Sequence, residues 1–323
     1  MTKYSKMAVV AAVALSFSSF VSPVGTKTLC DGFLPPNSMK IPVGDVHAAG
    51  ISQDMFNKVL DRAQQLYGPI ISSKGGKLKI NRRWEDATVN ASAQQSGSSW
   101  IINMYGGLAR HSAINEQGFA LVVCHELGHH LGGYPKSSWA TNEGGSDYYA
   151  TLKCMRSFYG TGAPSGAVDP VAKAGCDAQF SNPGESNSCQ TGSQGGSSVA
   201  YLFQALSGDS APPKFDTPDA SAVDSMMDEH PPTQCRMDTY YQGALCRKSA
   251  GEDVSGDNPN SGACTRKNGQ SSGLRPRCWY FPPADEPAAM PSMASHTPVQ
   301  LPSSDSVKER IQALQSALSG RGV

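Results

Sequence analysis

The spacing of apolar and polar residues predicts both helices and strands in the first third of the chain. Between residues 51 and 67, apolar side chains recur every three to four positions, which places them on one face of a helix. Residues 77–84 alternate between apolar and polar side chains and predict a strand. Residues 88–93 and 100–105 flank a polar stretch and predict a β-hairpin. Together these segments predict an α+β fold with a small mixed sheet.

Helical spacing also dominates the middle of the chain, with one interruption. Residues 116–131 have a strongly apolar first half, and the two glycines that follow are expected to end this helix, as glycine commonly does. Residues 159–197 are rich in Gly, Ser and Pro and predict an ordered loop. Three further helices are expected at residues 141–157, 198–206 and 233–245.

The first 25 residues have the composition of an export signal. Lys3 and Lys6 precede an apolar run at residues 7–15, and small residues follow this run. The run is too short for a membrane anchor, which needs about 20 apolar residues. We therefore expect residues 1–25 to be a signal peptide, no membrane span in the mature chain, and a secreted or periplasmic location.

The other end of the chain also differs from the centre. Residues 283–323 are rich in Pro, Ser and Ala, and they predict a tail that carries one short amphipathic helix at residues 307–318. No internal repeat divides the residues in between. Residues 26–282 are therefore expected to form one domain.

Charge and composition exclude several classes of protein. The chain contains 27 basic and 27 acidic residues, so its formal net charge is zero. No block of Lys or Arg is present. The sequence therefore predicts no basic surface that would bind nucleic acid or an anionic membrane. Hydrophobic residues make up 39% of the chain, enough to build a core, and this excludes disorder of the whole chain.

Nine cysteines in an exported chain predict disulfides, with one thiol left over. No pair of cysteines has the close spacing of a structural zinc site. Cys176 and Cys189 are expected to pair, because they are close in the sequence and lie in a predicted loop.

The remaining cysteines are constrained by the predicted helices. Cys235 and Cys246 are not expected to pair, because eleven residues of helix separate them by about 16 Å, whereas bridged Cα atoms lie within about 7 Å. Cys154 is the expected partner of Cys235. Cys124, which has apolar neighbours on the helix at 116–131, is the expected free thiol.

The motif that indicates a chemistry is His125-Glu126-Leu127-Gly128-His129. On a helix, His125 and His129 lie on one face, so both imidazoles can bind one metal ion. Glu126 is then placed to take a proton from a metal-bound water, as in zinc peptidases. His130 would lie about 100° around the helix from His129, which makes it a poor ligand.

Two histidines are not enough, because a catalytic zinc usually has three protein ligands and an open position. A metzincin would need His or Asp at position 135, where this chain has Pro135. Glu143 and Asp147 have helical spacing, so Glu143 can supply an oxygen ligand and Asp147 can accept the N–H of a ligating ring. Gly144 and Gly145 are expected to give a face without side chains that packs against the zinc-binding helix.

These residues resemble those of the gluzincin metallopeptidases, and within them the CAAX prenyl protease and HtpX-like family. Val89-Asn90-Ala91 is similar to that family's Asn-Ala motif, and Gly106-Gly107-Leu108 is similar to the Gly-Leu-Leu that follows its edge strand. Residues 230–236, His-Pro-Pro-Thr-Gln-Cys-Arg, are similar to its HisPro-x4-Arg signature. The resemblance covers about residues 85–240.

The resemblance implies a zincin-like fold, in which a small mixed sheet with an edge strand packs on the zinc-binding helix, and the cysteines predict that disulfides stabilise the domain. The resemblance and the export signal together imply a secreted zinc endopeptidase that holds one Zn²⁺ per chain through His125, His129 and Glu143. Protein or peptide substrates would bind as an added strand, and residues 100–105 are the candidate edge.

Two further residues of the signature are catalytic candidates. His230 can donate to the oxyanion that forms during attack, held in place by the prolines that follow it. Arg236 can clamp Asp147, Glu143 or a substrate carbonyl, and these three roles stay open. The alternatives to this function are a thermolysin-like gluzincin and a secreted zinc-binding protein without turnover.

Overall fold

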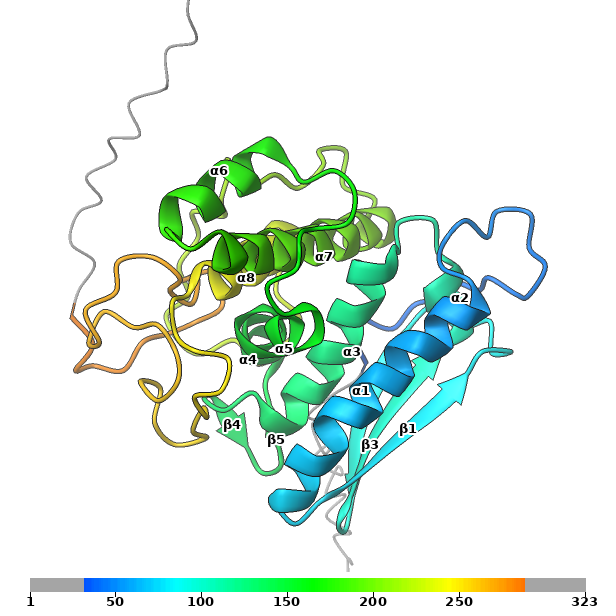
Figure 1. The fold of residues 1–323 in the computed structure, drawn as a ribbon, viewed down its shortest axis with the longest axis horizontal. Coiled ribbons are helices and arrows are strands. Elements are labelled where there is room, and N and C mark those ends of the chain that lie inside the picture. The colour runs from blue at the N-terminus through cyan, green and yellow to red at the C-terminus, as the bar shows by residue number, and fades with distance from the viewer. Residues whose placement is uncertain (1–31, 288–323) are drawn as a thin grey trace, which may run out of the picture.

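The structure is a computed structural model that describes residues 32–287 (Figure 1). The predicted signal peptide and the predicted helix at 307–318 lie outside these residues. Strands are β1 (Lys77–Arg83), β2 (Ala91–Ser96), β3 (Ser99–Tyr105), β4 (Lys136–Ser137) and β5 (Ala140–Thr141). Helices are α1 (Gln53–Ser73), α2 (Gly106–Arg110), α3 (Glu116–Leu131), α4 (Glu143–Tyr149), α5 (Met155–Tyr159), α6 (Pro170–Gln179), α7 (Pro183–Ser207) and α8 (Thr233–Leu245), and a π-helical turn at Ala150–Cys154 joins α4 to α5. This mixed arrangement of helices and small sheets agrees with the α+β prediction.

The main sheet has the strand order β1-β3-β2. Strand β3 pairs in parallel with β1 and antiparallel with β2, which forms the predicted hairpin. The expectation that residues 100–105 form an edge is therefore wrong, since β3 is the central strand. Its Ile102 and Met104 are fully buried, whereas β2 ends in the exposed Gln94 and Gln95. The edge beside the histidine helix is β2.

Helix α3 is the central element of the molecule. It packs on β2 and β3 on one side and on α7 on the other, and it also contacts α1 and α4. Helices α6, α7 and α8 pack together beyond α3, as Figure 1 shows. The long apolar stretch of α3 is completely buried by these neighbours, which explains why its hydrophobic residues are not confined to one face.

The prediction of an ordered loop at 159–197 is wrong, because most of this segment belongs to α6 and α7. Three glycines in the middle of α7, Gly192, Gly195 and Gly196, lie where this helix contacts its neighbours. A Cβ added to Gly195 would come within 2.9 Å of the Gln117 carbonyl oxygen on α3, and one added to Gly196 within 3.0 Å of Tyr240 Cβ on α8. Close packing against two helices therefore stabilises a segment whose glycines disfavour a helix by themselves.

Four disulfides stabilise the domain: Cys124–Cys154, Cys176–Cys189, Cys235–Cys278 and Cys246–Cys264. The Cys176–Cys189 pair and the absence of a Cys235–Cys246 pair are as predicted. The expected Cys154–Cys235 pair is wrong, and so is the free thiol at Cys124. The π-helical turn packs on α3 and brings Cys154 next to Cys124, so the apolar surroundings of Cys124 include its disulfide partner. All eight cysteines of residues 32–287 are paired, and Cys30 lies outside them.

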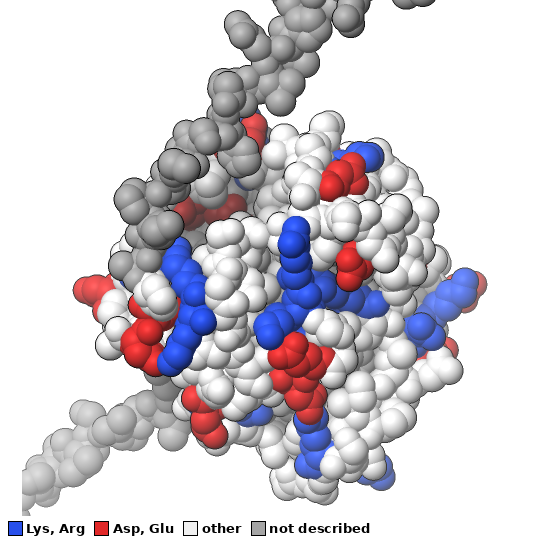
Figure 2. All heavy atoms as spheres, turned by 60° about the vertical axis from the view of Figure 1, so that its left-hand side comes forward, with Lys and Arg blue, Asp and Glu red and all other residues white. Residues whose placement is uncertain are grey.

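Disulfides are typical of proteins in an oxidising compartment, in agreement with the predicted export. Among residues 32–287, no helix has the length and apolar character to span a bilayer. Figure 2 shows basic and acidic side chains interspersed over the face that it displays.

Candidate metal centre

Helix α3 places His125 and His129 side by side in the interior. Asn115 caps the helix by accepting a hydrogen bond from the Gly118 N–H at 2.8 Å, and the helix spans the residues that the sequence predicts. Both imidazoles are completely buried, and their ring centres lie 4.7 Å apart. The Nε2 atom of each ring has no hydrogen-bond partner.

The other nitrogen of each ring is held by an acceptor. His125 Nδ1 donates to the Asp147 carboxylate at 2.7 Å, and His129 Nδ1 donates to the Thr141 carbonyl oxygen at 2.9 Å. A proton fixed on Nδ1 leaves the lone pair on Nε2, which is the form of histidine that binds a metal. Both histidines therefore present free lone pairs to the same point.

Glu143 completes this group from the first turn of α4, whose cap is Asn142. One carboxylate oxygen of Glu143 lies 3.3 Å from His125 Nε2, and the other lies 3.6 Å from His129 Nε2. One ligand atom from each of the three side chains lies within 4.8 Å of the others, so a single metal ion can bind all three. The three side chains therefore form a candidate metal site whose histidine nitrogens and carboxylate oxygen suit Zn²⁺, and the unpartnered buried atoms at its centre are those that a cation would satisfy.

Opposing effects set the charge of the two glutamates. Burial by itself raises the pKa of Glu143, but the neighbouring His129 and His125 outweigh it and hold that pKa at about 2. Burial raises the pKa of Glu126 to about 7, only partly offset by the same histidines. Neither Glu126 oxygen has a hydrogen-bond partner. Glu143 is thus suited to be an anionic ligand, and Glu126 to accept and release a proton near neutral pH.

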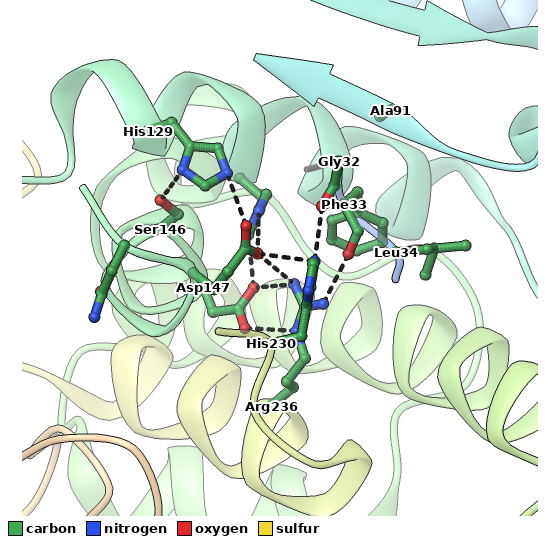
Figure 3. Close-up of polar contacts among 12 residues, drawn as sticks. Gly32, Phe33, Leu34, Ala91, His129, Ser146, Asp147, His230 and Arg236 are labelled. Atoms are coloured by element: carbon green, nitrogen blue, oxygen red, sulfur yellow. Dashed lines mark hydrogen bonds and ion pairs between the residues drawn. The ribbon is translucent and has the colours of Figure 1, made fainter. Parts of the chain in front are cut away.

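Asp147 connects the centre to α8. Besides His125, its carboxylate accepts bonds from Arg236 Nε at 2.7 Å and Arg236 Nη2 at 2.8 Å (Figure 3). It also accepts a bond from the Tyr240 hydroxyl at 2.5 Å. Burial opposes ionisation, but the Arg236 guanidinium holds the pKa of Asp147 well below its usual range. Of the roles left open for Arg236, the structure therefore places it on Asp147, with Nη2 at 3.8 Å from Glu143.

His230 reaches the same centre from the loop that precedes α8. Its Nε2 lies 3.5 Å from a Glu143 carboxylate oxygen and donates to the Gly32 carbonyl oxygen at 2.7 Å (Figure 3). Burial lowers the pKa of His230 below its usual value, and the attraction of Glu143 only partly offsets this effect. All seven predicted site residues are thus brought together, although they come from α3, α4, α8 and the loop before α8.

The neighbouring His130 is not part of this group. Its ring lies between the rings of Trp100 and Trp139, with centroid distances of 5.4 and 5.0 Å, and its Nε2 bonds to the Ile101 carbonyl oxygen at 3.2 Å. Burial lowers the pKa of His130 to about 4. This position agrees with its exclusion as a ligand.

The glycine contact between α3 and α4 differs from the prediction. A Cβ on Gly144 would come within 2.2 Å of the Trp279 ring, and one on Gly145 within 2.6 Å of Thr141, so neither faces α3. The close approach is made by Gly128 of α3, where a Cβ would lie 3.0 Å from the Ser146 backbone.

Sequence reasoning missed three groups that orient the site. Tyr240 follows Arg236 by one helical turn, and this spacing could have indicated that both reach the same carboxylate. Thr141 and Ser146 contact His129 Nδ1, the latter at 3.1 Å through its hydroxyl. Their roles depend on how β5 and α4 pack on α3, which no local pattern shows.

Replacing Asp147 by Asn tests the orientation of His125. We expect zinc affinity to fall by about 10–100-fold, as for other groups that hold a ligating histidine. The measurement is competition with a chelator of known affinity, with Asp257→Asn in an exposed loop as the control. An Asp147→Asn protein with the affinity of the wild type would show that the carboxylate does not orient the ligand.

Comparison with known protein families, characterised proteins and solved structures finds no significant match.

Proposed function

We propose that the protein is a zinc-dependent endopeptidase of the zincin type, similar to the gluzincins. The observation that carries this proposal is the separation of 3.3 and 3.6 Å between Glu143 and the two histidine Nε2 atoms, with the unpaired carboxylate of Glu126 buried in the same helix turn. A structural zinc site is closed by four protein ligands, whereas this set offers three and leaves a position open.

The chemistry follows from the donor set. When bound, Zn²⁺ lowers the pKa of a water molecule toward about 7 and polarises a carbonyl. Glu126 accepts the proton of the attacking water and returns it to the leaving amine nitrogen, for which its raised pKa is suited. Asp147 and Arg236 do not touch substrate in this mechanism; they orient His125 and are positioning residues.

Substrate would bind on the edge of β2. The Ala91 carbonyl oxygen at the start of β2 already accepts a backbone N–H from outside the sheet, so this edge can bind an extended chain. Binding through main-chain groups provides affinity with little dependence on side chains.

The function is tested with an unstructured protein as substrate and with two zinc-loaded forms of the enzyme, the intact chain and the chain cut by a specific protease after Pro36. Hydrolysis is expected to stop when a chelator removes the metal and to return when Zn²⁺ is restored. Hydrolysis that persists without metal, or its absence in both forms, would contradict the proposal.

His230→Ala is expected to lower kcat by about 10²–10³-fold, the usual effect of removing one oxyanion donor. Zinc content should stay unchanged, because His230 is not among the three ligands. The measurement is kcat together with bound zinc, and His47→Ala, in an exposed loop, is the matched control. A kcat equal to the wild type would eliminate the role, and loss of zinc would make His230 a ligand.

A further inference from the structure

Residues 32–34 lie directly against the candidate metal centre. The Gly32 carbonyl oxygen accepts the bond from His230, and the Phe33 N–H donates to the Ala91 carbonyl oxygen at 2.9 Å. The Leu34 N–H donates to the Asn90 side-chain oxygen at 2.9 Å, and the Asn90 side-chain amide donates to the Leu34 carbonyl oxygen at 3.1 Å. Of these three residues, Phe33 makes the main-chain bond to the start of β2, and Leu34 is held by the Asn90 side chain just before that strand.

The pairing continues in the same direction along the chain. Met39 accepts a backbone bond from Val89 at 3.3 Å, and the Ile41 N–H donates to Ala87 at 2.9 Å. As the segment advances from Phe33 to Ile41, its partners run backward from residue 91 to residue 87, so it is antiparallel to them. The segment therefore runs along the chain that leads into β2, beside the edge on which an extended substrate would add to that strand.

Phe33 closes the space beside the histidines. Its ring lies 5.0 Å from the His125 ring and 4.8 Å from the Arg236 guanidinium, and its carbonyl oxygen accepts a bond from Arg236 Nη1 at 2.8 Å. Phe33 is completely buried, as are His125 and Glu126. A peptide bond has no access to Glu126 in this arrangement.

We propose that residues 32–34 are an autoinhibitory latch that occupies the position of a substrate strand. The inference rests on the proposed peptidase function. The latch occupies the Ala91 carbonyl oxygen, the Asn90 side chain, the His230 donor, and the space next to His125. Opening requires displacement or cleavage of this segment, and the chain just after it is accessible, since Pro35, Pro36 and Ser38 are exposed.

The latch can leave once the chain is cut. All eight cysteines of residues 32–287 pair among themselves, so a break after Pro36 leaves no disulfide between the latch and these residues. What then holds it are hydrogen bonds and the packing of Phe33 and Leu34. A strand that serves only to stabilise the core would not change access to the histidines without unfolding the domain.

The experiment inserts the recognition sequence of a specific protease after Pro36. The matched control carries the same insertion after Gly162, in an exposed loop between α5 and α6. Access is measured in metal-free protein, by mass spectrometry of His125 and His129 after reaction with diethyl pyrocarbonate, with the exposed His47 as internal standard. Circular dichroism confirms that the cut domain stays folded.

Cutting after Pro36 is expected to raise modification of His125 and His129 by about tenfold or more, because reactivity scales with the fraction of open molecules. Cutting after Gly162 is expected to change nothing. If the fragment stays bound after the cut, adding Phe33→Ala should release it. Unchanged modification in a folded protein that has lost the fragment, or in the cut Phe33→Ala protein, would overturn the latch.

The zinc-loaded forms of the same proteins separate the latch from the proposed function. Zinc-dependent hydrolysis should rise with the cut in parallel with histidine access. Histidines that become accessible without any hydrolysis would reject the peptidase function and leave the latch standing.

Discussion

Glu126→Gln is expected to retain zinc and to lose about 10²–10⁴-fold in kcat, the contribution of a positioned general base. The substitution keeps the shape of the side chain and removes its ability to accept a proton. Because Glu126 is not one of the three ligands, the metal should stay bound. The measurement is the hydrolysis rate and the zinc content of the same preparation.

The matched control for this substitution is Glu185→Gln in the exposed first turn of α7. It removes one carboxylate of the same type away from α3 and should leave the rate unchanged. If Glu126→Gln hydrolyses peptides at the rate of the wild type, Glu126 is not the base.

Glu143→Ala is expected to lose both the metal and the activity. The remaining His125 and His129 provide only two of the three protein ligands that a catalytic zinc usually has. Zinc measured after dialysis should fall from one ion per chain to a small fraction, as should peptide hydrolysis. Near-stoichiometric, tightly bound zinc in this variant would remove Glu143 from the ligand set.

His129→Ala is expected to have the same result by loss of a different ligand. His130→Ala is its control, because the neighbouring imidazole lies between two tryptophans and faces away from the centre. A wild-type zinc content in His129→Ala would mean that the two histidines of the motif do not share an ion.

Local patterns were sufficient for the parts of the fold that carry the motif. The helix at 116–131 has the predicted bounds, because its cap, its apolar stretch and the following glycines all lie within one segment. The strand at 77–84 and the helix at 233–245 were predicted for the same kind of reason. The helix that carries His125, Glu126 and His129 could therefore be predicted without any tertiary contact.

Tertiary contacts decide what the patterns missed. Helix α7 forms around Gly195 and Gly196 because α3 and α8 lie against them, and glycine content alone favours a loop. Strand β3 became central because β1 pairs with its free side, an arrangement that hairpin spacing does not reveal. The partner of Cys124 likewise depends on how α4 and the π-helical turn pack on α3.

The site was predicted as a set of residues and only partly as a set of contacts. Spacing on a helix indicated His125 with His129, and Glu143 with Asp147, since each pair lies on one helix face. The bond between Arg236 and Asp147 joins residues 89 positions apart, and the sequence left it as one of three options. The contact of Gly32 with His230 joins residues 198 positions apart and had no sequence signal.

X-ray absorption at the zinc edge of the zinc-loaded protein identifies the metal ligands without requiring a substrate. We expect two imidazole nitrogens and one carboxylate oxygen at about 2.0–2.2 Å, with a light-atom ligand in the remaining position. Glu143→Ala should lose this spectrum together with the metal. A sulfur ligand at about 2.3 Å, fewer than two imidazoles, or no bound zinc would mean that His125, His129 and Glu143 do not form the zinc site.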